Sequence, residues 1–232
     1  MPSFVFPLFL LAVLSGAGDR VTKIPHFPTN SYVTFVLGGM MIQASAGAVT
    51  MAGLALGSDI ETGFLYRMAL TPVRGSVLLI AQLAGIAVLG VAQTVIVLVV
   101  GLTLGKASIE AGVPGAFVLI LIVLLVTLTF GAIGMFVAVK TGSADRVHPL
   151  FSLTLALLFM SSVAMPRNLI QEDWFKTIAT VNPLSYPIEA ARSLFITGWD
   201  KEALALGCGI AGGALILALI GAVSSLRRRT AA

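Results

Sequence analysis

The chain has 232 residues, of which 58% are hydrophobic and 10% are charged, and its formal net charge at pH 7 is +4. Soluble domains carry about a quarter charged residues, so this composition excludes a soluble globular protein and indicates a polytopic membrane protein. The positive charge fits cytoplasmic loops that face anionic lipid better than it fits a nucleic-acid partner. The single cysteine, Cys208, excludes an internal disulfide and a multi-cysteine metal site.

Six apolar segments predict an all-α membrane protein, with six transmembrane helices in a single domain over residues 1–232. The expected spans are residues 2–15, 33–57, 76–104, 115–139, 149–165 and 203–225. A full span needs about 20 residues, so the first segment is short. A signal peptide is the alternative for it, but no positive region precedes its apolar run. We therefore interpret it as a first span that lacks its cytoplasmic beginning.

Residues 58–74, between the second and third spans, are polar and amphipathic and carry two acids and two arginines. Apolar side chains recur on one face at helical spacing: Ile60, Phe64, Leu65 and Met68. Asp59 and Glu61 stand near the expected start of this helix, where its dipole favours acids, and Pro72 ends it. The pattern predicts a short cytoplasmic helix, and an ordinary helix lying on the lipid headgroups is the alternative.

Basic residues set the expected orientation in the membrane. One set of loops holds them more densely than the other, and it contains Arg67, Arg74, Lys140, Arg146, Arg227, Arg228 and Arg229. Because cytoplasmic loops carry an excess of Lys and Arg, we expect this set of loops, and both termini, on the cytoplasmic side.

The predicted spans lack chemistry of their own. The second to sixth spans contain no Asp, Glu, Lys, Arg or His, whereas ion-coupled transporters and intramembrane enzymes need such groups at membrane depth. Residues 101–106 look faintly like a phosphate loop, but only three residues separate the glycines, and Ala107 follows the lysine. His26 and His148 lie in different loops. We therefore expect no catalytic, cofactor or metal site, and any energy for transport would come from another polypeptide.

Polar and small residues within the spans predict contacts between helices. Gln43, Gln82 and Gln93 are expected to hydrogen-bond across helices, and lining a substrate path is the alternative. Gly131 and Gly134 could instead loosen the fourth span. Small residues at four-residue spacing permit close packing, within one subunit or between two, at Gly53, Gly57, Ala205, Gly209 and Gly213.

The polar segment before the last span predicts two short helices. They cover residues 171–180 and 184–196, with a break at the Asn-Pro step between them. Glu189 and Arg192 are three residues apart and are expected to pair on one helix face. A structural lid or plug is the expected role of this segment, and direct contact with a substrate is the alternative. Three aromatic residues suit a membrane interface: Trp174, Tyr186 and Trp199.

Two segments resemble the permeases of the type-2 ATP-binding-cassette exporters. That family has an acidic residue, a Thr-Gly or Gly-Thr step, a leucine-bearing helix and Thr-Pro before its third span. The matching residues here are Glu61-Thr62-Gly63, Leu65, Leu70, Thr71-Pro72-Val73 and the span that begins at 78–82. The family also has a signature before its last span, in a region that lies outside or dips into the outer leaflet. Here it reads Asn182-Pro183-Leu184, Tyr186 and Arg192.

The resemblance implies a non-enzymatic membrane subunit in the plasma membrane of a bacterium. A separate cytoplasmic ATPase subunit would bind the ATP, and a second copy or a homologue would complete the pathway. The residues implied in ATPase coupling are Asp59, Glu61, Gly63, Arg67, Pro72 and Arg74. Those implied in the outer re-entrant motif are Asn182, Pro183, Tyr186, Glu189 and Arg192.

The uncharged spans also bear on the substrate. They offer no partner for a buried ion, so we expect an amphipathic or hydrophobic molecule, drug-like or lipid-like. An energy-independent membrane scaffold or assembly protein is the alternative from another class. A secondary transporter is a further alternative, which the uncharged spans disfavour.

Overall fold

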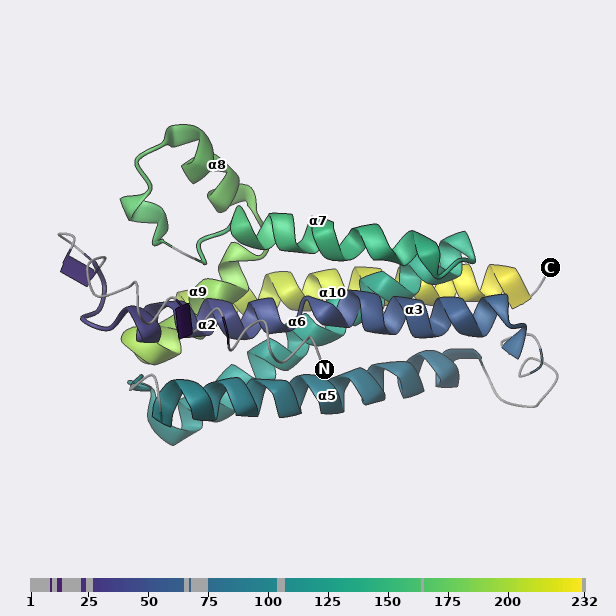
Figure 1. Cartoon of the computed structure of the whole chain (residues 1–232), viewed down its shortest axis with the longest axis horizontal. Helices are drawn as coiled ribbons and strands as arrows, with labels where there is room; N and C mark the ends of the chain where they lie inside the picture. Colours follow the sequence, from purple (N-terminus) through teal and green to yellow (C-terminus); the bar gives the residue numbers. More distant parts are fainter. Residues whose placement is uncertain are drawn as a thin grey trace.

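The computed structural model describes residues 9, 12–13, 22–23, 27–64, 67, 75–103, 107–163 and 165–230. Its elements over these residues are helical (Figure 1). They are α2 (Tyr32–Ala44), α3 (Gly47–Glu61), α5 (Gly75–Thr103), α6 (Gly112–Thr141), the 3₁₀ turn η2 (Asp145–Val147), α7 (His148–Phe159), the 3₁₀ turn η3 (Arg167–Leu169), α8 (Asp173–Val181), α9 (Ser185–Ile196) and α10 (Lys201–Thr230).

Four stretches are long and apolar enough to cross a membrane. They are Tyr32–Glu61, Val77–Thr103, Gly112–Thr141 and Lys201–Arg229. The all-α membrane class is therefore confirmed, and four predicted spans correspond to these stretches. The predicted first span, residues 2–15, lies outside the described residues except for positions 9 and 12–13.

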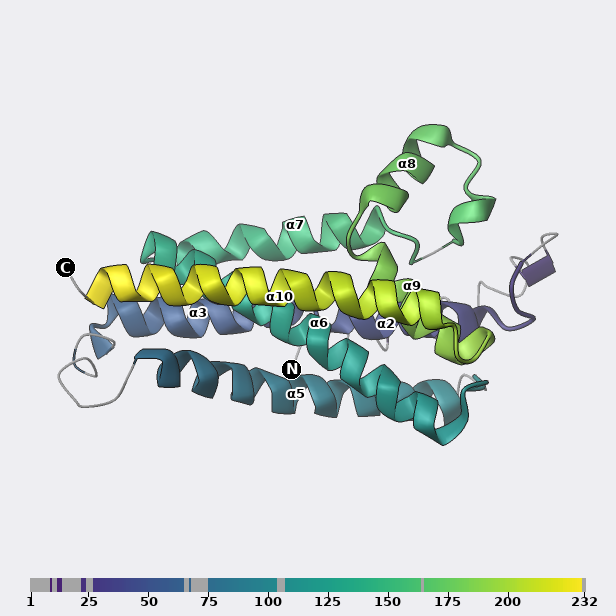
Figure 2. The ribbon, with the colours of Figure 1, turned by 180° about the vertical axis from the view of Figure 1, so that it is seen from behind.

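The Tyr32–Glu61 stretch forms the centre of the packing and consists of two helices. α2 ends at Ala44 and α3 begins at Gly47, and the hydroxyl groups of Ser45 and Thr127 lie 2.9 Å apart at the break. α2 is almost wholly buried, whereas α10 is largely exposed although it is apolar. An exposed apolar helix is the expected arrangement where lipid, rather than water, surrounds the protein. From behind, α10 crosses α6 (Figure 2).

Glycines bring α3 and α6 into close contact. A Cβ atom added at Gly53 would lie 2.8 Å from the Gly134 carbonyl oxygen, and one added at Gly134 would collide with the Val49 carbonyl oxygen. The small residues of α3 therefore serve packing within one subunit, and α6 remains helical through Gly134. By contrast, a Cβ at Gly209 or Gly213 would meet no other described atom within 4 Å.

The predicted fifth span, 149–165, is wrong in its extent. α7 has 12 residues, so it is about 18 Å long, which is shorter than a full span. Residues 160–163 form turns instead of continuing the helix. In this part of the chain, the carbonyl oxygens of Ser162 and Val163 accept hydrogen bonds from Arg192 instead of from a further helical turn.

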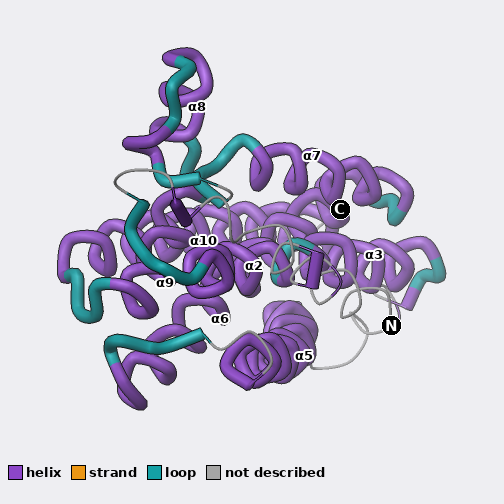
Figure 3. The backbone as a smooth tube through the Cα atoms, turned by 60° about the vertical axis from the view of Figure 1, so that its left-hand side comes forward, coloured by secondary structure: helices purple, strands orange, loops and turns teal. Residues whose placement is uncertain are grey.

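The two short helices predicted before the last span are confirmed. α8 and α9 are separated by residues 182–184, close to the expected break. α9 packs against α2, α6 and α10, whereas α8 projects from the other helices and contacts η3 (Figure 3). The α8–α9 region and the start of α2 lie at one end of the molecule, and the ends of α3 and α10 lie at the other (Figure 1).

Candidate functional site

The acidic residues predicted for the coupling segment lie at the end of a long helix. α3 continues to Glu61, so Asp59 and Glu61 occupy its last turn, and the expectation that they begin a separate helix is wrong. The helix continues because Gly57 and Ser58 do not interrupt its apolar face, which extends to the buried Ile60. It ends at Glu61, and Gly63, two residues later, has a φ of +69°, a conformation that glycine adopts without strain.

The residues beyond Gly63 are described only in part. Phe64 and Arg67 are helical, and the Arg67 amide donates to the Gly63 carbonyl oxygen at 3.1 Å. Arg67 is exposed. Pro72 and Arg74, the other two residues predicted here, lie outside the described residues.

Because acids at a helix C-terminus face the negative end of its dipole, they need partners elsewhere. The Glu61 carboxylate accepts a hydrogen bond of 2.8 Å from the Ala144 amide, in the loop after α6. Ala144 immediately precedes η2, which leads into α7. The end of α3 is thus connected to the start of α7 through one side chain.

Other contacts support this connection. Gln82 of α5 donates to the Asp59 carboxylate at 3.3 Å, as expected for a glutamine that bonds across helices. A Cβ added at Gly57 would lie 2.6 Å from the Ala144 Cα atom, so only glycine lets the loop approach α3 this closely. Ala144 was not among the predicted residues. The available signals in the sequence were the glycines at 57 and 142, and Gly142 adopts a left-handed φ of +73° in the structure.

Basic side chains gather at the same end of the molecule. Lys140 lies near the end of α6, with its amine 5.5 Å from the centre of the Phe136 ring. Arg146 is exposed in η2, and Arg229 lies beside Gly142. Arg227 and Arg228 complete the group in the last turn of α10.

At the opposite end, Asn182 and Arg192 connect several elements. The Asn182 amide donates to the Leu157 carbonyl oxygen at 2.6 Å, and its own oxygen accepts from the Leu184 amide at 3.0 Å. Arg192 is 7% exposed, and its guanidinium lies 3.7 Å from the centre of the Phe35 ring. It donates to the carbonyl oxygens of Phe35 at 3.1 Å, Ser162 at 2.6 Å and Val163 at 3.1 Å.

The predicted ion pair between Glu189 and Arg192 is wrong. Glu189 pairs instead with Arg167, and the Arg167 guanidinium lies 4.9 Å from the centre of the Tyr186 ring. Hydrogen bonding to the Glu189 carboxylate raises the pKa of Arg167. Burial lowers the pKa of Arg192 to about 9, so Arg192 still carries its charge at pH 7. The reason for the difference is geometric, because Arg192 points toward α2 while Glu189 faces η3.

The described residues contain no group of three or more His, Cys, Asp or Glu side chains that could hold a metal ion. The long apolar helices, the buried polar contacts around α9 and the basic end of the molecule define a multi-pass α-helical membrane protein. The chain matches the ABC-2 type transporter family over residues 2–196 and belongs to that family. It is therefore a non-catalytic membrane permease subunit.

Individual relatives are 24–30% identical to the chain over the aligned residues. A ycf38 transport permease of Porphyra purpurea is 24% identical over 86% of this chain and 69% of its own length. The ycf38 transport permease of Pyropia yezoensis is 26% identical over 84% of this chain and 67% of its own length. The daunorubicin resistance ABC transporter permease protein DrrB1 of Streptomyces coeruleorubidus is 30% identical over 72% of this chain and 58% of its own length.

Proposed function

We propose that this chain is the membrane subunit of an ATP-driven exporter for an amphipathic or hydrophobic compound. Separate cytoplasmic ATPase subunits supply the energy, and two copies of the chain, or the chain and a homologue, form the pathway. The protein resides in the plasma membrane of a bacterium with both termini in the cytoplasm. A drug-like substrate is supported by the name of one relative, which refers to daunorubicin resistance.

The contact between Glu61 and Ala144 carries the proposal. An ATPase that presses on the segment after Gly63 moves the end of α3, and the hydrogen bond to Ala144 transmits the movement to η2 and α7. The segment's proposed coupling residues are Asp59, Glu61, Gly63, Arg67, Pro72 and Arg74. Gly63 has a left-handed backbone, and a Cβ added there would meet no described atom within 4 Å, so we propose that it acts as the hinge between α3 and the segment that the ATPase contacts.

The orientation follows from the basic residues at the same end. Lys140, Arg146 and the arginines at the end of α10 lie there, and an excess of basic residues is typical of the cytoplasmic side. The α8–α9 region then lies on the outer side. Its Trp174 is 62% exposed and Trp199 is 52% exposed, as suits residues at a membrane interface.

The test is co-purification of the full chain with its ATPase, expressed together in one host. We expect Glu61→Arg and Gly63→Trp to lower the recovered ATPase by about tenfold, since a loss of about 1.4 kcal/mol in binding has that effect. Glu202→Arg and Gly198→Trp are matched controls at the opposite end. Gly198 also has a positive φ, +83°, and a Cβ added there would meet none of the described atoms within 4 Å.

Export of daunorubicin from intact cells is measured in parallel. If the unchanged chain recovers no ATPase, or if the Glu61 and Gly63 variants keep both the partner and export, the coupling proposal is wrong. Export that persists after ATP depletion and stops when the proton gradient is removed would identify a secondary transporter instead.

A further inference from the structure

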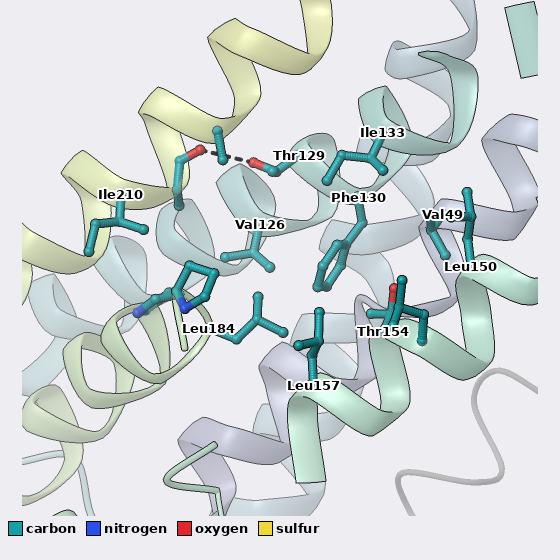
Figure 4. Close-up of a pocket in the computed structure, with 15 residues that line it drawn as sticks. Val49, Val126, Thr129, Phe130, Ile133, Leu150, Thr154, Leu157, Leu184 and Ile210 are labelled. Carbon is teal, nitrogen blue, oxygen red and sulfur yellow. Dashed lines mark hydrogen bonds between the residues drawn. The ribbon is translucent and has the colours of Figure 1, made fainter. Parts of the chain in front are cut away.

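A cavity of about 280 Å³ lies beside α7. α7 forms one wall through Leu150 and Leu157, and α6 forms the floor through Phe130 (Figure 4). The opposite wall consists of Leu184, before α9, and of Ile210 and Ala214 on α10. The residues of α7 that line it extend from Leu150 in its first turn to Leu157 in its last.

The lining of the cavity is almost entirely apolar. Two of its residues carry hydroxyl groups, Thr129 and Thr154. The Thr129 hydroxyl lies 2.8 Å from the Leu125 carbonyl oxygen, so it is already hydrogen-bonded. It also lies 3.1 Å from the Ala211 carbonyl oxygen (Figure 4). A bound water molecule needs two to four polar partners, and this lining does not provide them. An apolar occupant is therefore favoured.

The size of the cavity restricts that occupant. A dry apolar cavity of about 150 Å³ holds benzene, whereas sites for drug-sized ligands measure roughly 300–1,000 Å³. The present cavity, at about 280 Å³, falls between the two. It suits a hydrocarbon chain better than a complete amphipathic compound with its polar part.

The cavity opens on the outer surface of the helices. Leu153 lines it and is nevertheless 57% exposed, and Leu157 lines it and is 38% exposed. Both belong to α7, next to further exposed apolar side chains at Phe151 and Phe159. Because the protein spans a membrane, the medium at this opening is the hydrocarbon of the bilayer.

We propose that this cavity binds one acyl chain of a membrane phospholipid, which enters from the side past α7. The inference does not depend on the ATPase or on the exported substrate. The walls of an empty cavity lack partner atoms on one side, so they lose dispersion attraction. A hydrocarbon chain in the cavity contacts these walls and restores that attraction.

The experiment uses the full chain in phosphatidylcholine vesicles. A small fraction of the phosphatidylcholine carries a diazirine in the middle of one acyl chain, and illumination is followed by mass spectrometry of the labelled peptides. We expect labels on Phe130, Leu184 and Ile210, which line the cavity. Labels on Leu217 and Ile220, exposed residues of α10, serve as the measure of general lipid contact.

Ala214→Phe fills the cavity, and Ala205→Phe places the same ring at an exposed position of the same helix. We expect Ala214→Phe to lower the cavity labels roughly tenfold and Ala205→Phe to leave them unchanged, because only the first ring occupies the space of the chain. Leu157→Ala enlarges the cavity without filling it, so its cavity labels should persist or rise even if Ala214→Phe folds poorly.

Three results would overturn the proposal. Labels confined to Leu217 and Ile220 would mean that no acyl chain enters. Equal cavity labels in the Ala214→Phe and Ala205→Phe proteins would mean that the labels arise elsewhere. Illumination that joins two copies of the protein at the cavity, in place of lipid labelling, would mean that a second subunit covers it.

Discussion

The two ends of this molecule are held together in different ways. At the α8–α9 end, the buried Arg192 guanidinium donates to three main-chain carbonyl oxygens and lies against the Phe35 ring. At the basic end, the carboxylate of the exposed Glu61 accepts one solvent-exposed hydrogen bond from the amide of the half-buried Ala144. Breaking a buried polar contact leaves groups without water, whereas an exposed one exchanges its partner for solvent at little cost. The first end is therefore fixed, and the second is suited to movement.

The largest effect is expected from removing the buried arginine. Arg192→Met leaves the carbonyl oxygens of Phe35, Ser162 and Val163 without their donor, which should lower the free energy of unfolding by about 3 kcal/mol or more. Arg192→Lys keeps the charge but not the planar group, so its loss should be intermediate. Thermal unfolding in detergent measures both. An unchanged Tm for Arg192→Met would mean that the hydrogen bonds of Arg192 do not hold this end of the molecule in place.

The next effect concerns the close packing of α3 against α6. A methyl group at Gly134 collides with the Val49 carbonyl oxygen, so Gly134→Ala should lower the free energy of unfolding by about 1–3 kcal/mol. Gly213→Ala is the matched control, because it meets no described atom within 4 Å and should stabilise α10 by roughly 0.5–1 kcal/mol. Equal Tm values for the two variants would show that α3 and α6 are less closely packed than described.

A smaller effect is expected for the partly exposed ion pair between Arg167 and Glu189. Their side chains are 22% and 29% exposed, so solvent screening leaves a coupling energy of about 1 kcal/mol or less. The double-mutant cycle of Arg167→Gln and Glu189→Gln measures it by thermal unfolding. A coupling energy as large as the loss of stability in Arg192→Met would mean that the ion pair stabilises this end as much as Arg192 does.

The sequence predicts the long helices well, because hydropathy depends on local composition. α5, α6 and α10 begin and end within a few residues of their predicted spans. It does not predict the break at Ser45, which contains neither glycine nor proline and is stabilised by a hydroxyl contact to the distant Thr127. The early end of α7 likewise depends on Arg192, thirty residues later than Ser162.

The candidate site is predicted only by its residue types. Charged residues are rare in this chain, so Asp59 and Glu61 are readily identified as candidates. The same charges led to a predicted end of the second span before Asp59, whereas α3 continues through both residues. The partner of Glu61 is a main-chain amide 83 positions away, and a main-chain group has no sequence signature. Similarly, helical spacing pairs Glu189 with Arg192, whereas tertiary packing gives each a different partner.

The smallest effect on stability and the most specific effect on transport are expected at Glu61. Glu61→Ala should change the free energy of unfolding by no more than about 0.5 kcal/mol, because its hydrogen bond to the Ala144 amide is exposed and water can replace the carboxylate. If the bond transmits movement to α7, the same variant should lose most of its export while the ATPase still co-purifies. Glu61→Gln retains a carbonyl oxygen that can accept from the Ala144 amide, so it should export nearly as well as the unchanged chain. Export lost equally in both variants would assign the role to the charge of Glu61 at the ATPase contact, and not to the connection with α7.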